Sequence, residues 1–346
     1  MKALTYQGPG RREWHEVPDP VIVDAEDAVV RVDAVTICGT DLHILKGDVP
    51  EVTPGRVLGH EAVGTIEQVG PGVVGFVPGD RVLISCIAGC GRCQYCRENR
   101  DGQCVAGGGW MLGHLIDGTQ AEWVRVPFAN RALHHLPDSV SNEDALLLAD
   151  ILPTAYEVGV RNGRVEPGST VAIVGAGPIG LAAVLTSRLL SPSRIVVVDP
   201  AAERRAAALK LGADIAVSNA EEVTDAISSL GDGLGVDTAI EAVGIPETFE
   251  LCADLVRPGG TVANVGVHGA AATLHLERLW ISDVTITTGL VDTSSTPMLL
   301  RLLADGQIST DGLVTHRFGL DEIQDAYDVF SRPQDSGALK VALFNQ

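Results

Sequence analysis

The sequence predicts an α/β protein with two domains, one β-rich and one built on a doubly wound parallel sheet. The chain has 346 residues, more than one ordinary core, because domains usually contain ~100–200 residues. Its first ~150 residues carry short Val-rich runs between turn signals, which is typical of an all-β barrel or sandwich. Beyond them, apolar strands alternate with helical segments, and this alternation predicts a parallel sheet.

In the β-rich part, the short runs Ala28–Val35 and Arg81–Ile84 are expected to be strands. Turn-forming pairs of glycine and proline separate the runs of this part; they are Gly8-Pro9, Pro54-Gly55, Pro71-Gly72 and Pro78-Gly79. A Leu- and Ala-rich helix is expected at Glu143–Ala149, where the character of the chain changes.

The second part predicts strands and helices in alternation. The expected strands are Ser169–Val174, Arg194–Val198, Val236–Ala242 and Thr261–Val267. The expected helices are Ile179–Leu190 and Ala201–Leu211, the second ending at Gly212 as a C-cap. The last segment leaves this pattern, with helices at Pro297–Leu303 and Leu320–Phe330 and a strand at Leu339–Phe344.

The composition excludes several classes of partner. The chain carries 45 Asp and Glu against 25 Lys and Arg, a net charge of −20, so phosphate backbones and anionic lipid should be repelled. We therefore expect neither nucleic-acid nor membrane binding. The uncharged stretch Pro167–Ser187 is interrupted by Gly175, Gly177, Pro178 and Gly180, which marks a strand, a turn and a helix start and not a membrane span.

Four of the seven cysteines are closely spaced. An odd number of cysteines and no export signal at Met1–Gly10 predict a reducing, cytoplasmic location without a disulfide framework. The spacing Cys90-x2-Cys93-x2-Cys96-x7-Cys104 favours one tetrahedral structural zinc, because closely spaced thiolates converge without help from the fold. An iron–sulfur cluster and redox dithiols are the alternatives.

The segment Gly175-Ala176-Gly177-Pro178-Ile179-Gly180 follows a predicted strand and opens a helix. In this context it is the dinucleotide fingerprint of a Rossmann domain: Gly175 makes the tight turn, Gly177 admits the pyrophosphate and Gly180 permits helix–strand packing. Pro178 and Ile179 begin the helix whose N-terminus faces the pyrophosphate. The alternative is a glycine loop that only packs a helix.

Asp199 lies at the end of the next strand, 19 residues after Gly180. Its carboxylate should accept from the adenosine ribose hydroxyls and repel a 2′-phosphate, which favours NAD over NADP. Arg204 and Arg205 are close enough in sequence to bind a phosphate instead.

A third constellation combines Cys38, Thr40 and His43 with His60 and Glu61. Cysteine and histidine with a nearby hydroxyl could form a catalytic zinc site with an open position. Taken singly, a buried cysteine is more often a small apolar side chain, and a histidine is more often satisfied by hydrogen bonds.

With these motifs in this order, the chain resembles the zinc-dependent medium-chain alcohol dehydrogenases over essentially its whole length, in the bacterial secondary-alcohol, polyol and threonine dehydrogenase-like branch. Gly59–Gly64 resembles that family's zinc signature. The resemblance implies a GroES-like catalytic domain at 1–152 with a structural zinc lobe at 86–106. It also implies a Rossmann NAD-binding domain at 153–289 and a return to the catalytic domain at 290–346.

The resemblance also implies catalytic roles. Cys38, His60 and Asp150 are similar to the catalytic zinc ligands, with Asp150 where much of the family has a cysteine. Glu61 is the alternative ligand, which exchanges with water. Thr40 and His43 resemble the proton relay.

Further positions resemble cofactor and substrate contacts. Thr154 is similar to a nicotinamide contact and Lys340 to a pyrophosphate contact, while Trp110, Thr40 and Leu290 are similar to walls of the substrate pocket. For Trp110, plain packing is the alternative. The remaining cofactor positions are Arg204, Val243, Gly266, Val267, Leu290 and Val291. The other histidines show no ligand spacing, and His134-His135 is expected to be a surface pair.

These observations predict a zinc- and NAD-dependent dehydrogenase that interconverts a secondary alcohol or polyol and a ketone. Two zinc ions per chain are expected, one catalytic and one structural, in a homodimer or homotetramer. Threonine dehydrogenase-like, butanediol dehydrogenase-like or sorbitol dehydrogenase-like activity on the same scaffold is an alternative. A non-enzymatic zinc- and NAD-binding protein is another, disfavoured because such a protein needs no open metal site with a relay.

Overall fold

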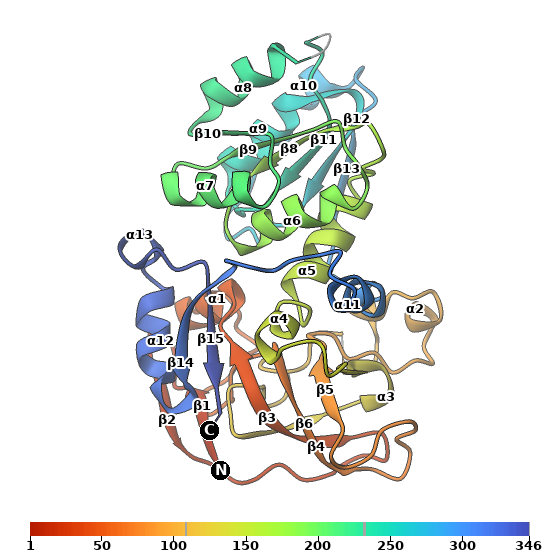
Figure 1. The fold of residues 1–346 in the computed structure, drawn as a ribbon, viewed down its shortest axis with the longest axis vertical. Coiled ribbons are helices and arrows are strands. Elements are labelled where there is room, and N and C mark those ends of the chain that lie inside the picture. Colours follow the sequence, from red (N-terminus) through yellow and green to blue (C-terminus); the bar gives the residue numbers. More distant parts are fainter. Residues whose placement is uncertain (108, 231–232, 346) are drawn as a thin grey trace. The chain divides into compact units, whose positions relative to one another are not determined.

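The chain folds into two units, seen in the computed structural model in Figure 1. The first unit contains Met1–Pro153 and Val291–Gln346, and the second contains Thr154–Leu290. The structure describes residues 1–107, 109–230 and 233–345. No helix in these ranges is long and apolar enough to cross a membrane.

The first unit is built on a seven-stranded sheet in the order β14-β15-β3-β4-β5-β7, with β6 paired to β3. Strand β3 (Ala28–Thr36) lies at its centre and pairs antiparallel with three neighbours. The other strands of this sheet are β4 (Ala62–Val69), β5 (Arg81–Ile84), β6 (Trp123–Val126), β7 (Leu133–His135), β14 (Val314–Gly319) and β15 (Lys340–Phe344). Strands β1 (Lys2–Tyr6) and β2 (Arg12–Glu16) form a separate antiparallel pair.

Short helices surround this sheet. Most contain four to nine residues, because proline and glycine interrupt the chain often. They are α1 (Gly39–Lys46), α2 (Gln94–Arg97), α3 (Ala129–Ala132), α4 (Asn142–Leu146), α11 (Thr296–Ala304), α12 (Ile323–Phe330) and α13 (Pro333–Ser336), with 3₁₀ turns η1 (Asp101–Gln103) and η3 (Leu320–Glu322). Helix α5 (Ile151–Thr154) spans the boundary between the two units.

The second unit is a six-stranded parallel sheet in the order β10-β9-β8-β11-β12-β13. Its strands are β8 (Thr170–Val174), β9 (Arg194–Val198), β10 (Ile215–Val217), β11 (Val236–Glu241), β12 (Val256–Asn264) and β13 (Thr285–Thr288). The chain starts at the centre and winds outward in both directions. A crevice for ligands is therefore expected at the carboxyl ends of β8 and β11.

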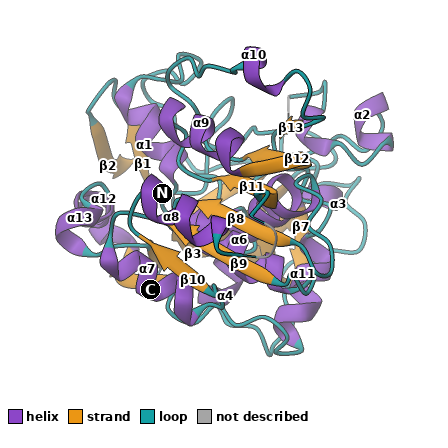
Figure 2. Ribbon diagram, turned by 90° about the horizontal axis from the view of Figure 1, so that it is seen from above, coloured by secondary structure: helices purple, strands orange, loops and turns teal. Residues whose placement is uncertain are grey.

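Helices cover both faces of this sheet (Figures 1 and 2), which is why its inner strands are continuously apolar and buried. The helices are α6 (Pro178–Arg188), α7 (Ala202–Lys210), α8 (Ala220–Ser228), α9 (Pro246–Leu255) and α10 (Leu276–Leu279), preceded by the π-helix η2 (Ala155–Arg161).

Most predicted elements are present, with two informative differences. Helix α4 ends at Leu146, earlier than the predicted Ala149, because turns carry the chain from there to Asp150. Strand β12 ends at Asn264, so that Gly266 and Val267 lie in the loop after it. That shift places both residues at the crevice edge of the sheet.

The predicted surface pair of histidines is wrong for one member. His135 is exposed and stacks on Phe76 at a centroid distance of 4.4 Å. His134 is partly buried in β7, and its Nε2 is buried without a hydrogen bond in the described part of the chain. Burial lowers the pKa of His134 to about 4, since a charged imidazole would lose its hydration there.

Replacing His134 by Leu is expected to reduce the loss of stability on acidification. The unfolded chain takes up this proton at a pKa of 6.5 and the folded chain only at about 4, so stability falls as pH falls through that window. Linkage puts the contribution at about 2 kcal/mol between pH 7 and pH 5. Urea unfolding of both proteins at the two pH values measures it.

The matched control is His135→Leu, which removes the exposed neighbour and should retain the pH dependence of the wild type. If the stability of wild type and of His134→Leu depended equally on pH, the lowered pKa of His134 would be contradicted.

Candidate metal and nucleotide sites

Four metal-ligating side chains converge in the first unit: Cys38, His60, Glu61 and Asp150. One ligand atom from each lies within 4.8 Å of the others. His60 Nε2 is 3.3 Å from Asp150 Oδ2 and 3.9 Å from Glu61 Oε1, and Cys38 Sγ is 3.7 Å from Asp150 Oδ2. The fold therefore brings together the residues that the resemblance implied, from the start of α1, the approach to β4 and the turn before α5.

Burial of several ionisable groups in this cluster disfavours their charged forms. Burial raises the pKa of the Cys38 thiol, and the charges of Glu61 and Asp150 raise it further. Burial also raises the pKa of Glu61, against the opposing effect of Lys340. Burial alone would lower the pKa of His60, but its hydrogen bonds to Asp150 and Cys38 raise it well above its ordinary value.

A divalent cation would stabilise the ionised forms of these buried groups. Thiolate, imidazole and carboxylate are the ligands that proteins offer to Zn²⁺, and a bound cation favours their ionised forms. Glu61 Oε2 is buried and accepts no hydrogen bond among the described residues. The donor set and this unpartnered oxygen both fit a zinc ion.

Lys340, which was predicted as a pyrophosphate contact, lies against Glu61 of this cluster. Its side chain is 1% exposed, and its Nζ donates to Glu61 Oε1 at 2.8 Å and to Ile37 O at 3.1 Å. Burial disfavours the ammonium, but the Glu61 charge outweighs this and raises the pKa of Lys340. Lys340 is thus a buried counter-ion of Glu61, and its contact with a pyrophosphate stays a prediction.

Three buried residues that the sequence analysis missed support Cys38. Asp41 Oδ2 accepts from the Cys38 N–H at 2.8 Å and from Gln120 Nε2 at 3.1 Å. The Tyr327 hydroxyl donates to Gln120 Oε1 at 2.7 Å. Asp41 could have been found as the N3 carboxylate of a helix capped at Cys38, but no local signal marks Gln120 or Tyr327.

The predicted relay residues share a face of α1. Thr40 Oγ1 lies 3.6 Å from Cys38 Sγ, at the cluster. One turn later, His43 Nδ1 lies 2.9 Å from Asp48 Oδ2, and the side chain is 28% exposed. Thr40 is therefore beside the metal-ligating atoms, and His43 reaches solvent.

Trp110 lies beside the cluster, where the resemblance implied a pocket wall. Its ring is T-shaped against His60 at 6.0 Å and stacks on His114 at 4.2 Å. His114, which had no predicted role, holds the indole through this stack and through its Nδ1 contact of 3.1 Å to Trp110 O.

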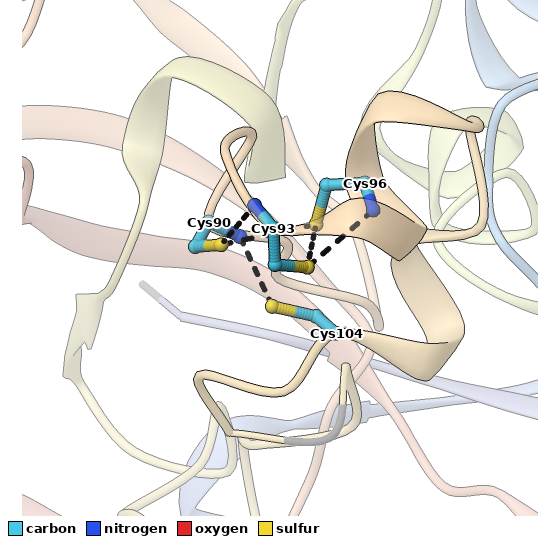
Figure 3. Close-up of side chains that lie close together, drawn as sticks. All are labelled: Cys90, Cys93, Cys96 and Cys104. Atoms are coloured by element: carbon cyan, nitrogen blue, oxygen red, sulfur yellow. Dashed lines mark hydrogen bonds between the residues drawn. The ribbon is translucent and has the colours of Figure 1, made fainter.

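The four remaining ligand candidates form a second cluster, shown in Figure 3. Cys93 Sγ lies 3.5 Å from Cys96 Sγ, and Cys90 Sγ lies 4.0 Å from Cys96 Sγ. Four sulfurs at about 2.3 Å from one zinc form a tetrahedron with edges of about 3.8 Å, which matches. In an iron–sulfur cluster the thiolates bind several irons, so the spacing favours a mononuclear ion over that alternative.

Backbone donors surround these sulfurs. The N–H groups of Cys90, Cys93 and Cys96 donate to Cys104, Cys90 and Cys93 respectively, at 3.3–3.5 Å. Hydrogen bonds from the N–H groups of Cys96 and Val105 lower the pKa of Cys93 to about 6. The loop thereby favours the thiolate of Cys93, the form that binds metal, whereas burial raises the pKa values of Cys96 and Cys104.

The glycine loop of the second unit has the predicted geometry. Gly175 has φ +98° directly after β8, and a Cβ on Gly180 would clash with Gly175 O. A Cβ on Gly177 would meet nothing within 4 Å, so this residue faces open space at the start of α6, where Pro178 and Ile179 form the first turn. An anion is stabilised at such a helix start.

Asp199 is joined directly to this loop. Its Oδ2 accepts from the Ala176 N–H at 2.8 Å and its Oδ1 from the Ala201 N–H at 2.9 Å. Arg205 donates to the carbonyls of Asp199 and Pro200, and Arg204 Nη1 lies 3.8 Å from Asp199 Oδ2. The guanidinium group of Arg205 therefore binds backbone carbonyls at Asp199 and Pro200, and that of Arg204 lies against the Asp199 carboxylate.

The other predicted cofactor positions are spread over both units. Val243, Val267 and Leu290 are exposed, the first two in the loops after β11 and β12 together with Gly266. Thr154 precedes η2, and Val291 is buried.

Comparison with known proteins agrees with this geometry. The alcohol dehydrogenase GroES-like domain matches residues 24–138, and the zinc-binding dehydrogenase family matches residues 178–305. An alcohol dehydrogenase of Cupriavidus necator is 37% identical over 99% of this chain and 98% of its own. The NADP-dependent isopropanol dehydrogenase of Thermoanaerobacter brockii is 33% identical over 97% of each.

Solved structures extend the similarity. The apo form of zinc-dependent alcohol dehydrogenase 2 from Streptococcus pneumonia matches with a TM-score of 0.96 and 48% identity, covering 100% of this chain and 99% of its own. Alcohol dehydrogenase TADH from Thermus sp. ATN1 matches with a TM-score of 0.92 and 38% identity over all of both chains.

Asp150→Asn is expected to lose one metal ion per chain, because the amide is a poorer zinc ligand than the carboxylate. Metal analysis of purified protein by mass spectrometry measures this. Asp144→Asn is the control, because Asp144 precedes Asp150 in the same segment of the chain and is a carboxylate outside both clusters. If Asp150→Asn keeps its full metal content while Glu61→Gln loses one ion, Glu61 is the ligand and the choice of Asp150 is wrong.

Cys93→Ser is expected to lose the ion of the four-cysteine cluster and to lower the melting temperature, because closed zinc sites contribute directly to stability. The control is Cys252→Ser, since Cys252 is a buried free thiol outside both clusters. A Cys93→Ser protein with unchanged metal content, or wild-type protein that contains iron, would contradict the assignment.

Proposed function

Because this chain belongs to the zinc-dependent medium-chain alcohol dehydrogenases, we propose that it oxidises a secondary alcohol or polyol to a ketone with NAD, and catalyses the reverse reaction. It is an oxidoreductase that acts on alcohols. The observation that carries the proposal is the convergence of Cys38, His60, Glu61 and Asp150 next to Thr40.

The cluster would hold the catalytic zinc through Cys38, His60 and Asp150, with Glu61 as the exchangeable ligand. Zinc held there would supply Lewis acidity, which lowers the pKa of an alcohol at the site. Lys340 compensates one of the cluster's negative charges and fixes Glu61 Oε1 by a 2.8 Å hydrogen bond. The unpartnered Oε2 is the atom that remains available.

The proton of the alcohol must leave the site when a ketone forms. Thr40 Oγ1 can accept it and donate its own, because a hydroxyl is both donor and acceptor. Asp48 Oδ2 engages His43 Nδ1, which leaves Nε2 as the free basic atom of the ring. His43 is partly exposed, so it can deliver the proton to solvent.

The stacked pair of Trp110 and His114 limits the space near His60. An indole face excludes water from one side of the site and offers an apolar contact to the carbon chain of a substrate. This supports an alcohol with an apolar substituent beside the hydroxyl.

The second unit would hold the dinucleotide, which supplies the hydride acceptor. The similar proteins do not share one cofactor. One relative is named as NADP-dependent, and a structure from Sinorhizobium meliloti was bound to NADP. A structure from Escherichia coli was complexed with NADH. The preference is therefore argued from Asp199, whose carboxylate would repel a 2′-phosphate. The arginines beside it already bind carbonyls or Asp199.

We propose further that the four-cysteine cluster holds a second, structural zinc and that the protein is a cytoplasmic homo-oligomer. The free thiols support a reducing compartment. Trp280 and Ile281 are 75% and 71% exposed near the edge strand β13, and apolar surface of this kind supports association between copies.

A panel of secondary alcohols, diols, polyols and threonine, assayed with NAD and with NADP by absorbance of the reduced cofactor, tests the proposal. For the best substrate, kcat/KM with NAD should exceed that with NADP by at least about tenfold, which corresponds to ~1.4 kcal/mol. Asp199→Asn should narrow this ratio, because it removes the charge and retains an oxygen acceptor.

Asp237→Asn is the matched control, because Asp237 also accepts a backbone N–H, from Thr170, at the opposite end of the sheet. Equal use of both cofactors by the wild type would show that Arg204 or Arg205 overrides the carboxylate. Activity with none of these alcohols would contradict the proposed substrate class.

A further inference from the structure

Glu241 is a fully buried carboxylate that no predicted role explains. It is the last residue of β11 and is 0% exposed. No lysine or arginine in the described ranges lies within 4.0 Å of it; His268 is its only ion-pair partner there, at 3.5 Å. Burying a carboxylate without a cation costs several kcal/mol unless hydrogen bonds compensate, so its contacts indicate what it does.

The contacts of Glu241 are with the loop that follows β11. Its Oε1 accepts from the N–H groups of Val243 at 2.9 Å and Gly244 at 2.8 Å, and from Thr248 Oγ1 at 2.7 Å. Three charge-assisted hydrogen bonds to one oxygen fix both the turn and the start of α9.

The loop after β12 packs against the same side chain. The carbonyl of Glu241 accepts from the N–H groups of Val265 and Gly266 at 2.9 and 3.2 Å. A Cβ on Gly266 would clash with Glu241 Oε2 and with Gly244. Only glycine at 266 therefore allows the two loops to meet over this carboxylate.

His268 encloses the other carboxylate oxygen. Its Nε2 lies 2.8 Å from Asn264 Oδ1 and 3.5 Å from Glu241 Oε2, and Asn264 Nδ2 donates to Gly266 O at 3.0 Å. Phe249 of α9 packs against the imidazole edge at 6.2 Å. The imidazole thus packs between the second loop and Glu241, whose Oε2 accepts no hydrogen bond among the described residues.

The order of the strands shows which part of a dinucleotide these loops would contact. Asp199, the proposed ribose contact, ends β9, and the pyrophosphate loop follows β8. The loops after β11 and β12 lie on the opposite side of β8, so a dinucleotide laid across the sheet from Asp199 would bring its nicotinamide half to them. They carry Val243 and Val267, 46% and 60% exposed.

We propose that Glu241 is a positioning residue whose carboxylate holds the loop after β11, and the loop after β12 that packs on it, in the form that binds the nicotinamide half of the cofactor. The inference rests on the proposed dinucleotide function. It assigns to the buried carboxylate the task of fixing the loop after β11 directly, through three hydrogen bonds. The loop after β12 packs against this carboxylate, and its N–H groups donate to the backbone carbonyl of Glu241.

The test compares NADH with ADP, which lacks the nicotinamide half, by titration calorimetry on the zinc-loaded full chain. Glu241→Ala should weaken NADH binding by at least about tenfold, equivalent to ~1.4 kcal/mol, and ADP binding by less than about twofold. Glu241→Gln should fall between wild type and Glu241→Ala, because its amide oxygen still accepts from one or more of the three donors. If the alanine variant does not fold, the same comparison on Glu241→Gln decides.

Thr238→Val is the matched control, since Thr238 is a buried residue of β11 whose hydroxyl donates to Gly163 O. This variant should be destabilised and yet bind both ligands as the wild type does. NADH and ADP weakened equally by the Glu241 variants, or neither weakened, would overturn the inference. A wild type that binds neither would overturn the dinucleotide function itself.

Discussion

The buried charge around His60 is the constraint on which the first unit depends. Cys38, Glu61 and Asp150 can each become an anion, and the one buried ammonium that contacts them in the described part of the chain is Lys340. Without a cation, burial pushes the pKa values of Cys38 and Glu61 upward and disfavours the ionised forms. A divalent ion reverses this balance, so the geometry is best understood as a ligand set.

The two metal clusters differ in how far apart their ligands lie along the chain, and this difference determines how well each cluster could be predicted. The cysteines from Cys90 to Cys104 lie on one loop, so their spacing alone indicated a site. Asp150 joins Cys38 and His60 from a distant part of the chain, and only the family resemblance indicated it. The contact of Lys340 with Glu61 was missed because nothing local shows that its side chain turns back to Glu61. Gln120 and Tyr327 were missed for the same reason, since hydrogen bonds between distant segments leave no sequence pattern.

The strands also differ in whether a local sequence pattern marks their ends. The apolar runs of β5 and β9 have the predicted bounds, because uninterrupted Val and Ile between polar residues define a strand locally. The early start of β12 was hidden by Pro258 and its glycines, which normally punctuate strands. Glu241 shows the opposite case: this charged residue at the end of an apolar strand was overlooked, although its carboxylate accepts three hydrogen bonds from the loop and the helix that follow it. In both units, buried polar groups carry more of the function than the apolar pattern indicated.

Zinc K-edge X-ray absorption of the purified protein, with the metal content determined in parallel, tests the central claim most directly. If zinc fills both clusters, the protein should contain two zinc ions per chain. The average should be about 2.5 sulfur ligands per zinc at ~2.3 Å, with nitrogen and oxygen as the other ligands. This average follows because one site offers four thiolates and the other offers one. One zinc per chain with four sulfur ligands would contradict the account, because the cluster at His60 would then hold no zinc.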